Sequence, residues 1–265
     1  LFVSCCAILY TDAWTRIESS QIDIIGLIIL VFGAFLGWRF DRNRLLYALA
    51  LLLIADIADR WLVIQSSFMT MHHIVAVLVP FNFCLIGLMK EKGVRKLYSL
   101  LQLALLPGQM VVIYFWLTRW GSLHLEFLEA THLPAPLNTI PDLFLVFFVL
   151  ALAVQFLRYL RFQTPIETAF IWAIVCASTA GVMTPGVEPT LFRIFAALII
   201  IISVFEMSYA MAYLDELTLL PSRRAQNEAL RKVGSQYVIA MADIDFFKKL
   251  NDTYGHDVGD QVLKM

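Results

Sequence analysis

The sequence predicts an all-α polytopic membrane region followed by the start of a soluble α/β domain. Of the 265 residues, 60% are hydrophobic and only 15% are charged, and the mean hydropathy is +0.76. Soluble proteins are far more polar than this. Asp, Lys and Arg become dense only toward the C-terminal end. We therefore expect a transmembrane region over residues 1–213 and an incomplete soluble domain over residues 214–265.

Seven apolar runs are long enough to span a bilayer, which requires about 20 mostly apolar residues. They cover residues 22–38, 45–65, 69–89, 97–118, 141–160, 166–184 and 191–213. Residues 1–11 form a further apolar run, which we interpret as the remnant of an eighth span. The first region is thus expected to lie in the lipid bilayer as seven to eight transmembrane helices.

Basic residues alternate between the connecting loops. Three loops carry clusters of Lys and Arg, namely Arg39, Arg42 and Arg44, then Lys90, Lys92, Arg95 and Lys96, then Arg158 and Arg161. The intervening loops are poorer in basic residues, with Arg16, Arg119 and Arg193. Because cytoplasmic loops carry the excess of Lys and Arg, we expect a multi-pass protein of the inner (cytoplasmic) membrane with its C-terminal domain in the cytoplasm.

A few ionisable residues fall within the predicted spans, where such residues are rare and often functional. Asp56 and Arg60 are four residues apart and share a helix face, so they can neutralise each other. This pair has two interpretations, a packing contact or a part of a sensory site. His72 and His73 lie near a membrane interface, where they are either ordinary interfacial residues or a sensor of pH or metal.

The soluble segment begins with almost no linker after the last span. Pro221 ends the incoming helix, and residues 223–233 form an amphipathic pattern that ends at Gly234. Residues 236–242 are a nearly continuous apolar run with the length of a strand buried on both faces. We therefore predict a helix followed by a strand of an α/β sheet.

Residues suited to metal and nucleotide binding follow directly after that predicted strand. Asp243 and Asp245 supply carboxylate oxygens, which Mg²⁺ prefers, and Lys248 adds a positive charge one turn further on. Asn251 and Asp260 offer an amide and a carboxylate that can recognise a base edge. The net charge of the chain is −1, so a nucleic-acid partner is not indicated.

Together these residues resemble the catalytic domain of diguanylate cyclases, the GGDEF family. The family begins with a pattern like D-x-L-T-G-L-P-N-R-R, which residues 215–224 match except that Leu219 replaces the usual glycine and Ser222 the usual asparagine. It continues with D-x-D-x-F-K-x-x-N-D-x-x-G-H-x-x-G-D, which residues 243–260 match throughout.

The resemblance also implies roles for individual residues. The Asp243 carboxylate and the Ile244 carbonyl are expected to bind Mg²⁺, and Asp245 is either a further ligand or structural. Three residues are expected to lie against the phosphates, Phe246, Phe247 and Lys248. Three more are expected in the guanine-nucleotide pocket, Asn251, His256 and Asp260.

The resemblance implies that the complete protein condenses two GTP molecules to cyclic di-GMP as a homodimer through its GGDEF domains, under control of a sensory membrane region. The signature G-G-[DE]-E-F does not occur in the 265 residues, so no complete catalytic set is present and this segment alone is expected to be inactive. Two alternatives remain. One is a degenerate GGDEF receptor or binding module coupled to a membrane sensor, and the other is a transporter with a regulatory tail.

Overall fold

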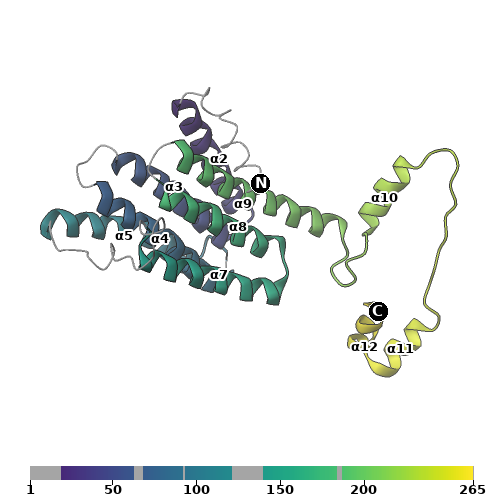
Figure 1. Ribbon diagram of the computed structural model, residues 1–265. Coiled ribbons are helices and arrows are strands. Elements are labelled where there is room, and N and C mark those ends of the chain that lie inside the picture. The colour runs from purple at the N-terminus through teal and green to yellow at the C-terminus, as the bar shows by residue number, and fades with distance from the viewer. Residues whose placement is uncertain (1–18, 63–67, 92, 121–139, 184–186, 265) are drawn as a thin grey trace. The chain divides into compact units, whose positions relative to one another are not determined.

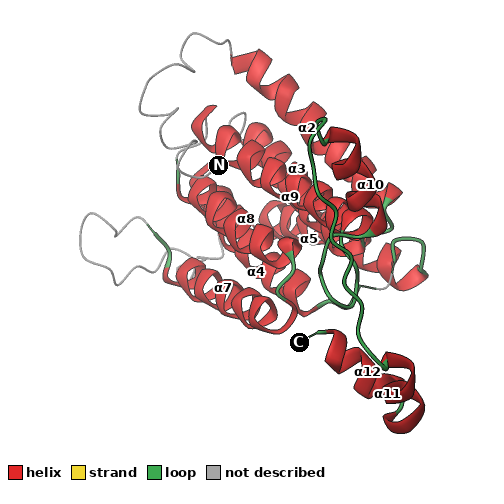
Figure 2. Ribbon diagram, turned by 90° about the vertical axis from the view of Figure 1, so that its right-hand side faces the viewer, coloured by secondary structure: helices red, strands yellow, loops and turns green. Residues whose placement is uncertain are grey.

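The computed structural model describes residues 19–62, 68–91, 93–120, 140–183 and 187–264. The predicted eighth span at residues 1–11 lies outside these ranges. Within them the chain forms ten helices and no strand (Figures 1 and 2). The helices are α2 Ser19–Arg39, α3 Asn43–Leu62, α4 Phe68–Leu88, α5 Leu97–Trp120, α7 Asp142–Phe162, α8 Pro165–Val182, α9 Val187–Tyr213, α10 Arg223–Lys232, α11 Phe247–Tyr254 and α12 His256–Leu263. Each of the seven complete predicted spans coincides with one of the first seven helices.

Four of these helices, α2, α7, α8 and α9, are long and apolar enough to cross a membrane. Shorter apolar stretches occur in α4 and α5, over His72–Leu88 and Leu97–Val112. Large apolar side chains such as Ile28, Val149 and Leu157 are exposed on α2 and α7, as expected for surfaces that face lipid rather than water. These features suggest a multi-pass membrane protein.

Helix α4 lies among α3, α7 and α8 and packs against all three. Small residues allow close helix contacts, as is usual between membrane helices. A Cβ atom added at Gly181 would lie 3.2 Å from the Cα of Ala76. Phe83 of α4 and Phe170 of α8 are fully buried and meet edge to face, with ring centroids 6.4 Å apart. The core of the membrane bundle therefore includes the contact of α4 with α8, and Ile74 and Val77 of α4 pack with Phe144 of α7 in a further part of it.

Helices α2 and α9 approach closely at two glycines. A Cβ atom at Gly26 would lie 3.1 Å from Ile194, and one at Gly33 would lie 2.9 Å from Ile201 and from Leu49 of α3. The two glycines are seven residues apart, as are the two isoleucines, so each pair lies on one helix face. The isoleucines of α9 thus fill the space that the glycines of α2 leave.

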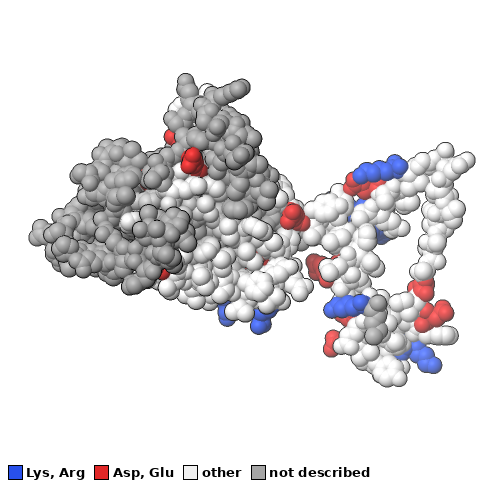
Figure 3. All heavy atoms as spheres, in the orientation of Figure 1, with Lys and Arg blue, Asp and Glu red and all other residues white. Residues whose placement is uncertain are grey.

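The chain divides into two compact units, Leu1–Val204 and Phe205–Met265, and the division falls within α9. The predicted functional boundary between residues 213 and 214 stays a prediction. In Figure 3 the described residues of the first unit present few charged side chains on the visible face, whereas the second unit carries many of both signs. This matches the change in composition along the sequence.

The predicted strand at residues 236–242 is not formed. This stretch is extended and unpaired, and Val238 and Met241 are both 96% exposed. A strand needs a neighbour for its N–H and C=O groups and for its apolar side chains, and the described residues of this unit provide none. The predicted helix at 223–233 is confirmed as α10, although none of its residues is buried.

Candidate functional site

The turn after α9 is held by the side chain of Asp215. Its Oδ1 accepts hydrogen bonds from the backbone N–H of Leu217 at 3.1 Å, and from the N–H and the hydroxyl of Thr218 at 2.9 Å each. These bonds favour the ionised carboxylate, so the Thr218 N–H, followed by its hydroxyl, lowers the pKa of Asp215. The Asp and Thr of the D-x-L-T pattern therefore form one local unit.

The same turn reverses the chain between α9 and α10. Leu214 and Pro221 form an isolated antiparallel bridge, and the Ser222 N–H donates to the Tyr213 carbonyl at 2.7 Å. Leu219 has a φ of 57°, a left-handed conformation that is unfavourable for a residue with a Cβ atom. The glycine that the family usually carries at this position would adopt this conformation without strain.

One polar side-chain interaction, between Tyr213 of α9 and Glu228 of α10, links these two helices. The Lys232 ammonium lies 2.7 Å from Glu228 Oε1. This ion pair, and after it the Tyr213 hydroxyl, lowers the pKa of the Glu228 carboxyl. Tyr213 in turn stacks on Tyr209 of α9, with ring centroids 4.6 Å apart. The junction between α9 and α10 is thus fixed by backbone and side-chain contacts together.

The proposed metal ligands lie just before α11. Asp243 is exposed, and its Oδ1 accepts the N–H of Ile244 at 2.9 Å. The Ile244 carbonyl accepts the N–H of Phe247 at 3.4 Å. Phe246 is exposed and left-handed, with a φ of 57°, where α11 begins.

These donors suit Mg²⁺ in kind but do not enclose it. A carboxylate and a carbonyl oxygen from consecutive residues are hard ligands, and Mg²⁺ in nucleotide sites commonly takes one or two carboxylates and completes its shell with phosphates and water. In the described ranges, no three His, Cys, Asp or Glu side chains are close enough together to hold a metal ion. Asp243 and Ile244 therefore fit one part of such a site.

Helices α11 and α12 form a tight hairpin that brings together part of the predicted nucleotide pocket. Gly255 makes the turn with a φ of 86°. A Cβ atom at Gly259 would lie only 1.8 Å from Oδ1 of Asn251, so the amide of α11 packs directly on the backbone of α12. Asp260 follows Gly259 and is exposed, as are Lys248 and His256.

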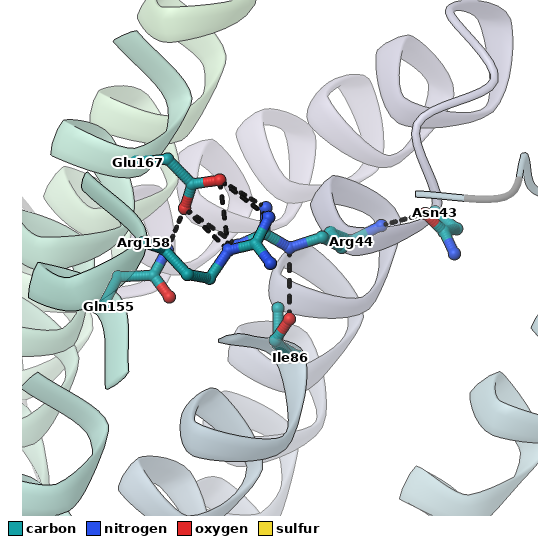
Figure 4. A network of polar contacts seen from close by, with 6 residues as sticks. All are labelled: Asn43, Arg44, Ile86, Gln155, Arg158 and Glu167. Atoms are coloured by element: carbon teal, nitrogen blue, oxygen red, sulfur yellow. Dashed lines mark hydrogen bonds and ion pairs between the residues drawn. The ribbon is translucent and has the colours of Figure 1, made fainter. Parts of the chain in front are cut away.

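The membrane unit contains two buried polar clusters. The first, the Glu167 cluster, consists of Arg44, Gln155, Arg158 and Glu167 and is drawn in Figure 4. The Glu167 carboxylate accepts two hydrogen bonds from Arg44, from Nη1 at 2.7 Å and from Nη2 at 3.0 Å. It also accepts hydrogen bonds from Gln155 Nε2 at 2.6 Å and from Arg158 Nη2 at 3.0 Å. Arg44 also donates from Nε to the Ile86 carbonyl at 3.1 Å. The cluster joins α3, α4, α7 and α8.

Sequence analysis did not identify Glu167 and assigned Arg44 and Arg158 to loops. In the structure Arg44 is buried in the first turn of α3, and its guanidinium lies over the ring of Phe170, 4.8 Å from the centroid. Glu167 is in the first turn of α8, which begins at Pro165. A lone acidic residue at the start of an apolar span, close in sequence to basic residues, was the available signal.

The second cluster, the Arg193 cluster, consists of Asp56, Asp59, His72, Thr190 and Arg193, all buried. Arg193 Nη1 lies 3.4 Å from Asp56 Oδ1, and its Nη2 pairs with Asp59 Oδ2. Asp59 Oδ1 is 3.4 Å from His72 Nδ1, and the Thr190 hydroxyl donates to Asp56 at 3.4 Å.

This cluster changes the interpretation of two residues. Arg193, predicted in a loop, is a buried residue of α9. The side chain of Arg60 lies outside the described side chains, so its predicted pairing with Asp56 stays a prediction. Asp56 has a different ion-pair partner in Arg193.

Comparison with known proteins identifies the C-terminal segment. Residues 212–265 match the family described as "Diguanylate cyclase, GGDEF domain". This segment belongs to the GGDEF family. The match includes the turn held by Asp215, the residues from Asp243 to the start of α11, and the hairpin of α11 and α12. It confirms the resemblance seen in the sequence.

Several curated proteins are similar to the same end of the chain. Response regulator PleD of Caulobacter vibrioides is 48% identical over 64 residues, which are 22% of this chain and 14% of PleD. Diguanylate cyclase DgcP of Pseudomonas aeruginosa is 43% identical over 61 residues, 20% of this chain and 9% of DgcP. Cyclic di-GMP phosphodiesterase NbdA of the same organism is 42% identical over 62 residues, 21% of this chain and 8% of NbdA. The chain thus spans only a small part of each relative, and no solved structure matches it significantly.

Proposed function

We propose that the complete protein is a membrane-bound diguanylate cyclase, which condenses two GTP molecules to cyclic di-GMP under control of its membrane unit. The observation that carries the proposal is the GGDEF match over residues 212–265, with every fixed position of the motif from Asp243 to Asp260 occupied. DgcP, similar over this segment, is named a diguanylate cyclase. The proposed reaction requires a homodimer in which each GGDEF domain holds one GTP.

Different residues of this segment would bind the guanine base, the phosphates and the metal ion. Asn251, which packs on Gly259 next to Asp260, would recognise the guanine base together with Asp260 and His256. Lys248, Phe246 and Phe247, around the start of α11, would contact the phosphates. Asp243 and the Ile244 carbonyl would hold Mg²⁺, which when bound neutralises charge on the reacting phosphate and acidifies the attacking hydroxyl.

The membrane unit is proposed to be an inner-membrane region of seven to eight spans. The seven helices α2–α5 and α7–α9, the four long apolar spans among them and the alternation of basic loops support this topology. The same alternation supports a cytoplasmic location for the segment after Tyr213, where GTP is available.

A degenerate GGDEF module that binds nucleotide without reacting is the second candidate. It is supported by the similar segment in NbdA, a protein named for phosphodiesterase activity. Cyclic di-GMP synthesis by the natural full-length protein separates the two candidates.

The metal assignment is tested by Asp243→Asn in the full-length protein. The neutral amide is nearly isosteric but binds Mg²⁺ far more weakly, so membrane insertion should be normal while cyclic di-GMP synthesis at saturating GTP and Mg²⁺ is lost. The matched control is Asp257→Asn, which neutralises an exposed carboxylate of α12 at a variable position of the motif. Near-normal turnover by Asp243→Asn would refute the metal assignment.

A further inference from the structure

The two buried clusters connect different sets of helices. The side chains of the Glu167 cluster come from α3, α7 and α8. Helix α4 takes part through its backbone, because the Ile86 carbonyl accepts a hydrogen bond from Arg44. The Arg193 cluster instead joins α9 to α3 and α4. Arg44 and Asp59 are 15 positions apart on α3, so the clusters lie about 22 Å apart along that helix.

Asp59 is the central residue of the Arg193 cluster. One of its carboxylate oxygens pairs with Arg193 of α9, and the other lies 3.4 Å from Nδ1 of His72 of α4. Asp56, one turn earlier on α3, contacts both Arg193 and Thr190 of α9 at 3.4 Å. The beginning of α9 is therefore attached to α3 and α4 by charged and polar groups that are shielded from solvent.

Helix α9 extends from this cluster to the junction with the GGDEF segment. It is continuous from Val187 to Tyr213, so one uninterrupted helix joins the residues of the cluster to the start of the GGDEF segment. Between them α9 packs on α2 through Ile194 and Ile201, which lie against glycines. These contacts are apolar and lack directional bonds, whereas the polar groups at the beginning of α9 make directional contacts with α3 and α4.

We propose that the Arg193 cluster is a latch that sets the position of α9 and through it the output of the GGDEF domain. The proposal rests on the proposed cyclase function. The Glu167 cluster keeps α3, α4, α7 and α8 together at the other end of α3, whereas the Arg193 cluster holds α9 against this frame. A signal that weakens the ion pair between Arg193 and Asp59 would shift α9. The movement of α9 would then displace the Asp215 turn, which follows α9 in the chain.

The test uses the full-length protein in membranes and a neutral triple variant, D56N, D59N and R193M. The triple variant removes all three charges, so none of them is left buried without its partner, and a milder variant, Arg193→Lys, keeps the charge but loses the two-pronged contact. The matched control is Glu188→Gln, which removes an exposed carboxylate from the first turn of α9. Movement of α9 is measured by the distance between spin labels at Ile202 of α9 and Leu160 of α7, both exposed, in a cysteine-free background.

The expected result is a shifted or broadened label distance in the triple variant and a change of about 5-fold or more in the rate of cyclic di-GMP synthesis per inserted molecule, the lower end of ordinary allosteric coupling. Arg193→Lys should change the label distance and the rate of synthesis in the same direction as the triple variant, by a smaller amount. Glu188→Gln should leave both the distance and the rate unchanged. An unchanged distance and rate in the triple variant would overturn the latch. If even the unaltered protein makes no cyclic di-GMP, the proposed function fails and the label distance alone decides the latch.

Discussion

Replacement of Glu167 by alanine is expected to destabilise the membrane unit more than any loss of a surface charge. Glu167 is the common acceptor of Arg44, Gln155 and Arg158 (Figure 4). Without it the Arg44 guanidinium stays in the interior with the Ile86 carbonyl and the Phe170 ring as its neighbours. Neither group carries a negative charge that balances it.

The expected magnitude follows from burial. The side chains of Arg44 and Glu167 are 3% and 4% exposed, and removal of one partner from such a buried pair costs about 3–5 kcal/mol. Arg158 is 23% exposed and can turn toward solvent, so its part is about 1 kcal/mol or less. We therefore expect a loss of about 3–5 kcal/mol, nearly all of it from Arg44.

The assay is reversible unfolding of the purified protein in mixed micelles, followed by tryptophan fluorescence. Glu188→Ala is the control, because it removes an exposed carboxylate in the first turn of α9 and should cost no more than about 1 kcal/mol. The double variant Arg44→Met, Glu167→Met should recover much of the loss because no charge of that pair is left buried. A loss below about 1 kcal/mol for Glu167→Ala would show that the buried pair contributes little, contrary to this reasoning.

Two further predictions concern the Asp215 turn. Leu219→Gly should stabilise the turn by about 1 kcal/mol because glycine adopts the left-handed φ of 57° without a Cβ clash. Limited proteolysis would detect this as slower cleavage at the turn, whereas Leu220→Gly, which has no such φ to relieve, should accelerate cleavage. The hydrogen bonds from Thr218 lower the pKa of Asp215 below its ordinary value of 3.8. The ionised carboxylate therefore stabilises the turn fully at a pH above 3.8, and this stabilisation is lost as the pH falls through the lowered pKa. The protection of the Thr218 amide, measured as its exchange rate relative to the intrinsic rate at the same pH, should therefore fall in acid, and an Asp215→Asn variant should lack that change.

The helices of the membrane unit were predictable because their signal is local. A run of about 20 apolar residues specifies a spanning helix without reference to its neighbours. The partners of the buried charges were not predictable in this way. Arg193 was assigned to a loop, yet its partners Asp56 and Asp59 are more than 130 positions away in the sequence. Such pairs depend on which helix faces meet, and one sequence does not contain that information.

The candidate site shows the same division between local and distant determinants. The Asp215 turn, α10 and the hairpin of α11 and α12 depend on residues near in sequence, and the predicted helix at residues 223–233 is present as α10. The strand expected at residues 236–242 depends on neighbouring strands, and the described residues provide none. Asp243 and Asn251 were predicted as site residues from the sequence, but the packing of Asn251 on the backbone of Gly259 came only from the structure.

The unpaired stretch before Asp243 has a consequence for the handling of this protein. Residues 237–242 are uncharged and lack proline, and Tyr237, Val238, Ile239 and Met241 are all exposed. Segments of this kind readily form intermolecular cross-β contacts. Molecules in which the stretch stays unpaired, such as nascent chains on the ribosome or proteolytic fragments, should therefore aggregate or engage chaperones. The carboxylates of Asp243 and Asp245 follow the stretch directly and oppose such contacts at that end only.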